Sequence, residues 1–79
     1  MTKNEIKRNI HDRFLELTKG ETDDQIMTKT GLTERDLDRI EDSVTVLTPI
    51  KLKAIADAYN VSMDWIVGRT DVKELGKQV

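Results

Sequence analysis

The most informative segment of the chain is Gln25-Ile26-Met27-Thr28-Lys29-Thr30-Gly31-Leu32-Thr33-Glu34-Arg35-Asp36-Leu37-Asp38-Arg39-Ile40. It predicts a short helix, a glycine turn and a second short helix. Gly31 permits the left-handed backbone that ends the first helix, and Thr33 caps the start of the second. Leu37 and Ile40 supply the inward positions that hold the second helix down. This order of elements is the helix-turn-helix layout, which here covers about residues 22–42.

The second helix of this unit, about residues 34–42, has a polar outer face. Because Leu37 and Ile40 occupy the inner side, we expect Glu34, Arg35 and Asp38 to face outward. A helix held at the surface in this way can enter the major groove of DNA, which is roughly 12 Å wide. The helix-turn-helix unit is therefore the candidate binding element of the chain.

Helix-start signals on both sides of this unit predict five helices and no strand. The signals are the capping boxes Thr2-x-x-Glu5, Thr22-x-x-Gln25 and Thr33-x-x-Asp36, then Thr48-Pro49, then Ser62. Helices are predicted at about residues 4–19, between residues 22 and 31, at 34–42, from 49 to about 60, and from 63 to about 67. Residues 43–47 form a loop in this scheme.

Apolar residues at helical spacing define the expected core. It consists of Ile6, Ile10, Phe14, Leu17, Ile26, Met27, Leu32, Leu37, Ile40, Leu52, Ile55, Ala56, Tyr59, Trp65 and Ile66. The domain is expected to end at residue 71, with a polar tail over residues 72–79. Residues 69–79 as a whole are polar and expected to fray.

Composition excludes several classes of protein. The chain has 79 residues, enough for one domain, and no cysteine, which excludes a disulfide framework and a thiolate metal site. His11 is the single histidine. With no phosphate loop and no nucleophile–base pair, we expect neither an enzyme nor a bound metal, cofactor or small-molecule substrate. The apolar runs are too short for a membrane span or signal peptide, so we expect a cytoplasmic protein of a bacterium or a phage-infected cell.

Two segments resemble the Cro/phage-repressor (XRE) helix-turn-helix family. Leu37-Asp38-Arg39-Ile40-Glu41 is similar to the family's Ile-Ser-Arg-Ile-Glu, and residues 52–68, LKAIADAYNVSMDWIVG, are similar to its closing segment. The resemblance covers roughly residues 6–71. It implies an all-α, compact five-helix domain of the phage-repressor type. It also implies a regulator that binds double-stranded operator DNA as a homodimer.

Carried onto this chain, the family's base-reading positions are Thr33, Glu34, Arg35, Asp38 and Asp23. Three of these five residues are acidic. Residues 21–42 hold eight acidic and three basic residues, a net charge of −5, whereas the rest of the chain carries +3. Since phosphate neutralisation supplies most non-specific DNA affinity, this charge works against DNA binding.

Other charged side chains have more than one interpretation. Candidates for phosphate contacts are Lys29, Lys51 and Lys53, although a solvated helix face fits Lys51 and Lys53 equally well. We expect Arg39 to form an intrachain salt bridge with a neighbouring acidic residue, whereas Arg35 fits a DNA contact and a surface ion pair equally well. His11 is expected at the surface. The polar side of the first helix, including Arg8 and Arg13, is expected to be solvated.

Two functions from different classes follow from these features. The first is a helix-turn-helix transcriptional regulator that binds operator DNA, as a repressor or an activator, with residues 34–42 in the major groove. The second is a small phage-type antirepressor, whose acidic helix-turn-helix binds the basic DNA-reading face of a repressor protein. The loop favours the second function in one respect: Val44, Val46 and Leu47 would form an apolar patch beside the acidic helix if they were exposed.

Overall fold

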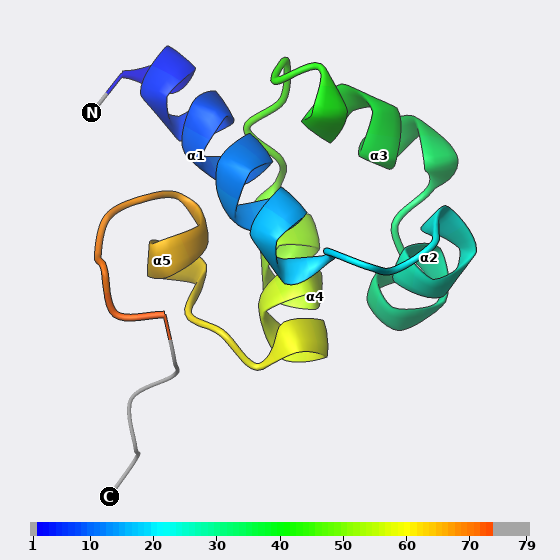
Figure 1. The fold of residues 1–79 in the computed structure, drawn as a ribbon. Coiled ribbons are helices and arrows are strands. Elements are labelled where there is room, and N and C mark those ends of the chain that lie inside the picture. The colour runs from blue at the N-terminus through cyan, green and yellow to red at the C-terminus, as the bar shows by residue number, and fades with distance from the viewer. Residues whose placement is uncertain (1, 74–79) are drawn as a thin grey trace, which may run out of the picture.

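The computed structural model describes residues 2–73, and within them the fold is all-helical. The helices are α1 (Lys3–Leu17), α2 (Asp23–Thr30), α3 (Glu34–Glu41), α4 (Pro49–Tyr59) and α5 (Met63–Ile66). Figure 1 shows their arrangement, with α2 and α3 at one end and α5 at the other. The predicted five-helix, strand-free fold is confirmed for the described part of the chain. None of its helices has the length and apolar character needed to cross a membrane.

Local hydrogen bonds set where the helices begin. All three predicted capping boxes are present, starting α1, α2 and α3. The hydroxyl of Thr48 accepts from the Lys51 amide at the start of α4, and the hydroxyl of Ser62 accepts from two amides of α5. Each cap satisfies amide groups that the first turn of a helix leaves without an intrahelical partner.

Left-handed residues end two of the helices, as the sequence predicts. Gly31 has a φ of 74° after α2, and Asn60 has a φ of 55° after α4. The end of α1 differs from the prediction, because the helix stops at Leu17 and not at residue 19. There the amide and the hydroxyl of Thr18 both donate to the Phe14 carbonyl, and residues 18–20 form a turn in which Gly20 has a φ of 85°.

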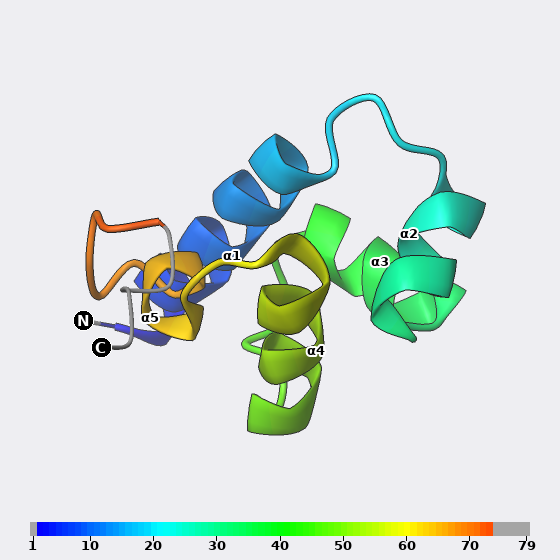
Figure 2. The ribbon, with the colours of Figure 1, turned by 90° about the horizontal axis from the view of Figure 1, so that it is seen from below.

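The helices pack around a single core. α1 lies against α3 and α5, and α4 lies against α2 and α5. Figure 2 shows the same arrangement from below, with α3 and α2 to one side of α1 and α4. The pairing places the helix-turn-helix unit on a base formed by α1 and α4.

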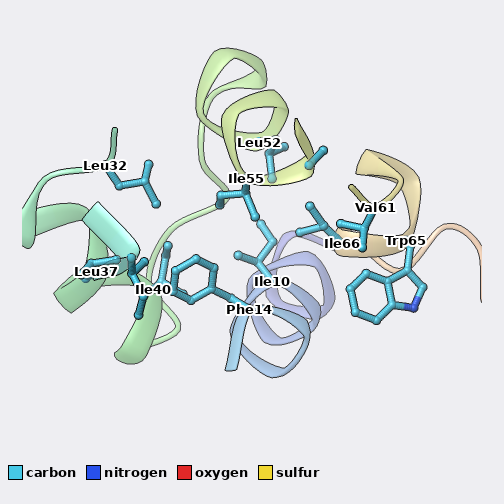
Figure 3. Close-up of a cluster of buried hydrophobic side chains, with 12 residues drawn as sticks. Ile10, Phe14, Leu32, Leu37, Ile40, Leu52, Ile55, Val61, Trp65 and Ile66 are labelled. Atoms are coloured by element: carbon cyan, nitrogen blue, oxygen red, sulfur yellow. The ribbon is translucent and has the colours of Figure 1, made fainter. Parts of the chain in front are cut away.

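The core runs through the molecule from the helix-turn-helix unit to α5 (Figure 3). Its buried apolar residues are Ile10, Phe14, Ile26, Leu32, Leu37, Ile40, Leu52, Ile55, Ala56, Val61, Trp65 and Ile66. The predicted core is confirmed at its centre. Four of its members, Ile6, Leu17, Met27 and Tyr59, lie at the edge and are only partly buried. Val61 was missed because it follows the left-handed Asn60, outside any helical apolar stripe.

Part of the segment expected to fray is attached to the fold. The Arg69 amide donates to the Asp64 carbonyl at 2.8 Å, and the Ser62 amide donates to the Lys73 carbonyl at 2.9 Å. Residues 69–73 therefore return to the start of α5. The rest of the predicted tail, residues 74–79, lies outside the described residues.

Candidate functional site

Helix α3 is anchored on one side and open on the other. Asp36, Leu37 and Ile40 are buried, the last with 1% of its surface exposed. Glu34 and Asp38, on the opposite side, are exposed. Because the buried residues recur every three or four positions, they hold the whole length of this short helix and leave its outer face free to contact a partner.

The outer face of α3 divides into two charged parts. Each residue advances about 100° around a helix, so residues three or four apart share a face. Glu34, Asp38 and Glu41 form an acidic stripe, and Arg35 and Arg39 form an arginine edge beside it. All five side chains are exposed.

No ion pair or hydrogen bond within residues 2–73 engages these five side chains. The expected salt bridge of Arg39 is therefore wrong for the described chain. The reason is geometric. The exposed acidic side chains of α3 project from other sides of the helix than Arg39, and the carboxylate of the buried Asp36 already binds another cation.

That cation is Lys51 of α4. Its ammonium donates to Oδ1 of Asp36 at 2.6 Å, while Oδ2 accepts from the Thr33 amide at 3.1 Å. Lys51 first, and then the hydrogen bonds from Thr33, hold the pKa of the Asp36 carboxyl below its ordinary value. The sequence placed Asp36 in the capping box but did not reveal this contact, since Lys51 is fifteen positions away.

The other two predicted phosphate contacts are also ion-paired. The Lys29 ammonium contacts the carboxylate of Glu21 and lies 5.3 Å from the centre of the Tyr59 ring. Lys53 donates to Asp57 at 3.0 Å, one turn along α4. A phosphate would have to compete with a carboxylate for each of these lysines.

Glu21 connects the start of the helix-turn-helix unit to α4. Besides Lys29, it binds the Tyr59 hydroxyl, which donates to Oε1 at 2.8 Å. These two donors lower the pKa of Glu21, Lys29 being the stronger influence. Partial burial and the adjacent carboxylate raise the pKa of Tyr59. The cluster thus joins α2 to α4 without using the outer face of α3.

The remaining base-reading candidates have different environments. Asp23 is exposed in the first turn of α2, where the helix dipole favours an anion. Thr33 is exposed, but its hydroxyl already accepts from the Asp36 amide at 3.1 Å. Of the five candidates, Glu34, Arg35 and Asp38 lie together on the outer face of α3.

An open depression of about 590 Å³ borders the arginine edge. Its lining includes Arg35 and Arg39 of α3 together with Thr45 and Thr48. It therefore brings guanidinium and hydroxyl groups together between α3 and the start of α4. The sequence alone does not identify Thr45 or Thr48 as part of a surface, because their proximity to α3 depends on the path of the loop.

The loop after α3 is partly buried and partly open. Leu47 packs against the core, whereas Val44 and Val46 have 49% and 38% of their surface exposed. Ser43 and Leu47 both have positive φ values, and the Val44 amide donates to the Arg39 carbonyl. The predicted apolar patch is therefore reduced to two valines beside α3.

Two residues of α1 have roles that the sequence did not predict. His11, expected at the surface, is half-buried, and its Nδ1 lies 3.0 Å from the Ile40 carbonyl oxygen. The carbonyl can only accept, so Nδ1 carries the proton in this contact. The Arg13 guanidinium lies 4.6 Å from the centre of the Trp65 ring and donates to the Trp65 carbonyl. Both contacts hold α1 to its neighbours.

Comparison of the chain with protein-family models, with curated proteins and with solved structures gives no match. The resemblance to the Cro/phage-repressor family stays a prediction based on the residues quoted above.

Proposed function

We propose that this protein is a helix-turn-helix transcriptional regulator that binds operator DNA as a homodimer, with α3 in the major groove. The observation that carries the proposal is the arginine edge. Arg35 and Arg39 are exposed on a helix anchored by buried residues, and neither is engaged by a carboxylate within residues 2–73. No existing ion pair has to break before these two side chains bind an external acceptor.

The dimensions and chemistry of α3 support this assignment. An α-helix with its side chains is about 10–12 Å across, which matches the major groove. Arginine donates in a planar fork to phosphates and to guanine. The depression between α3 and α4 adds the hydroxyls of Thr45 and Thr48, which are suited to phosphate oxygens. We place this activity in the cytoplasm of a bacterial or phage-infected cell, and it requires no cofactor and no catalytic group.

The acidic residues make non-specific binding weak. Of the eight carboxylates between residues 21 and 42, only Glu21 and Asp36 are ion-paired within the described chain. A carboxylate about 4 Å from a phosphate costs on the order of 1 kcal/mol in water. We therefore expect affinity to come chiefly from contacts in the correct operator and little from general attraction to the DNA backbone.

Fluorescence anisotropy with the full chain tests the proposal. A pool of labelled random duplexes is first enriched for bound sequences at about 50 mM salt, and the best duplex is then titrated up to about 200 mM. We expect specific binding that weakens with salt, with a double-logarithmic slope of about −4 for the homodimer if both arginines of each subunit displace counterions. Failure to enrich any duplex at low salt contradicts the proposal.

The matched variants are the double substitution Arg35→Ala/Arg39→Ala and the single substitution Arg69→Ala. The first should abolish enrichment, because it removes the arginine edge. The second removes an exposed guanidinium that lies 3.7 Å from Asp64 of α5. Helix α5 lies at the end of the molecule opposite α3 (Figure 1). Arg69→Ala should leave binding within about twofold. Equal losses in both proteins would assign the effect to overall charge and not to α3.

A second candidate function is supported by the acidic stripe. Between residues 21 and 42, six exposed carboxylates, three of them in the acidic stripe, have no ion pair within residues 2–73. Together with the exposed Val44 and Val46, they suit a basic protein surface. Under this proposal the protein is an antirepressor that covers the DNA-reading face of a phage-type repressor. The stripe and the two valines would form the contact.

The double substitution Glu34→Lys/Asp38→Lys separates the two functions. It should raise non-specific DNA affinity under either proposal, since it removes two negative charges and adds two positive ones on α3. Only under the second proposal should it also abolish binding to a repressor, measured by calorimetry. A repressor that binds wild type and variant equally would contradict the antirepressor proposal.

A further inference from the structure

The two charged parts of α3 have opposite hydrogen-bonding capacity. The guanidinium of Arg35 can only donate, whereas the carboxylates of Glu34 and Asp38 can only accept. These three side chains are exposed at adjacent positions of one anchored helix. Within residues 2–73, none of them is engaged by a hydrogen bond or an ion pair. Their full capacity is available to a partner.

A G·C pair offers the complementary pattern in the major groove. Guanine presents two acceptors, O6 and N7, which a guanidinium binds in bidentate fashion, and cytosine presents an amino group that a carboxylate accepts. Adenine places an acceptor beside its amino group, and thymine presents an acceptor and a methyl group. The adenine amino group can also donate to a carboxylate, but an A·T pair offers no two adjacent acceptors for the guanidinium of Arg35.

We infer that α3 selects G·C-rich operator half-sites, with Arg35 donating to guanine on one strand and Glu34 and Asp38 accepting from cytosine amino groups on the other. This inference rests on the proposed DNA-binding function and names its sequence specificity. It also assigns a purpose to the acidic stripe, whose negative charge is otherwise unfavourable near DNA.

The distribution of paired charges supports selection at the bases. The three predicted phosphate-contact lysines are all ion-paired, to Glu21, Asp36 and Asp57. Electrostatic attraction to the DNA backbone is correspondingly weak, so it adds little affinity for duplexes that lack the base contacts. Discrimination between sequences then depends on the side chains that reach the base edges.

Enrichment from a randomised duplex pool is the first test of the inference. The second is competition between the best duplex and copies of it in which single G·C pairs are replaced by A·T. We expect the enriched half-site to contain adjacent G·C pairs. Each replacement at a contacted pair should weaken binding by about 5- to 150-fold, equivalent to the 1–3 kcal/mol of a good bidentate contact.

Three variants connect the preference to particular side chains. Arg35→Gln should move the preference at one position from guanine to adenine, because an amide pairs with N6 and N7 of adenine. Glu34→Gln or Asp38→Asn should relax the requirement for cytosine on the opposite strand. Arg69→Gln removes an exposed arginine near α5 and should leave the selected sequence unchanged. Thermal melts verify that all four variants are folded.

The outcomes separate this inference from the proposed function. Enrichment of A·T-rich sites, or an unchanged preference in Arg35→Gln, overturns the inference and leaves DNA binding intact. Absence of binding to any duplex overturns both. A guanine-to-adenine change in Arg35→Gln, together with a relaxed cytosine requirement in Glu34→Gln, supports the inference.

Discussion

The α3 end and the α5 end of the molecule use charged side chains in opposite ways. Near α5, two cations contact the Trp65 ring, with Arg13 4.6 Å and Lys73 5.2 Å from its centre. These cations also pair with Asp71 and Glu16, respectively. On α3 the exposed charges have no partner within the described residues. Charge therefore stabilises the fold near α5 and is available for binding on α3.

Substitution of the main apolar anchor of α3 should have the largest effect. Leu37 retains only 5% exposure, and Leu37→Ala should lower the free energy of unfolding by about 2–5 kcal/mol. That is a large share of the roughly 4–12 kcal/mol expected for a domain of this size. Urea unfolding followed by circular dichroism measures the loss. Val44→Ala, at an exposed site, should change stability by less than about 0.5 kcal/mol.

If Leu37→Ala were as mild as Val44→Ala, the outer face of α3 would not be rigidly presented. The contrast between the anchored and the open side of this helix would then fail, and both proposed functions would lose their structural basis.

Gly68, next to α5, and Gly31, between α2 and α3, allow a direct comparison of the two ends of the molecule. A Cβ at Gly68 would lie 2.1 Å from Nδ2 of Asn9, which donates to the Val67 carbonyl, whereas a Cβ at Gly31 meets open space. Both glycines have positive φ. Gly68→Ala should lower the free energy of unfolding by about 2–3 kcal/mol, because the strain of a left-handed alanine adds to the loss of the Asn9 hydrogen bond. Gly31→Ala should cost about 1 kcal/mol from strain alone. Equal costs in thermal melts would show that the contact with Asn9 adjusts freely.

Arg13 near α5 and Arg35 on α3 allow the same comparison for the contribution of a single charged side chain to stability. Arg13→Ala removes the contact with the Trp65 ring and a 3.1 Å hydrogen bond to its carbonyl, and should cost about 1–2 kcal/mol. Arg35→Ala should cost less than about 0.5 kcal/mol, because Arg35 is exposed and has no partner in residues 2–73. Urea denaturation of both variants provides the measurement. A larger loss in Arg35→Ala would reverse the comparison.

The smallest effect concerns the inner side of α3. Lys51 and the Thr33 hydrogen bonds lower the pKa of Asp36 in the folded state, so the contact stabilises the protein above the unfolded pKa, near 3.9. This stabilisation is lost as the pH falls through the lower, folded pKa. Asp36→Asn should therefore cost about 1 kcal/mol near pH 7, and less in acid, as expected for a partly exposed ion pair.

Urea unfolding of wild type and Asp36→Asn at several pH values isolates this effect. The wild type has other carboxyls of lowered pKa, among them Glu5, Glu16 and Glu21, and will lose stability in acid in any case. Only the difference between the two proteins reports on Asp36. A difference that stays constant down to about pH 2.5 would contradict the assigned pKa shift.

Sequence patterns predicted the helices and most of the core because those features depend on nearby residues. A capping box joins groups three positions apart, so Thr33 and Asp36 identified the start of α3 directly. The spacing of Leu37 and Ile40 likewise identified its buried side. Val61 was missed because the left-handed Asn60 breaks the periodic pattern on which the prediction depends.

The candidate site was predicted only in part, for a physical reason. By itself, the sequence determined that about residues 34–42 form an amphipathic helix with Glu34, Arg35 and Asp38 on its polar side. Tertiary structure alone decided which charges are neutralised, since Lys51 meets Asp36 across fifteen positions and Tyr59 meets Glu21 across thirty-eight. Charge pairing depends on distances of a few ångströms between side chains of different helices, and those distances are set by how α1, α2, α3 and α4 pack around their common core.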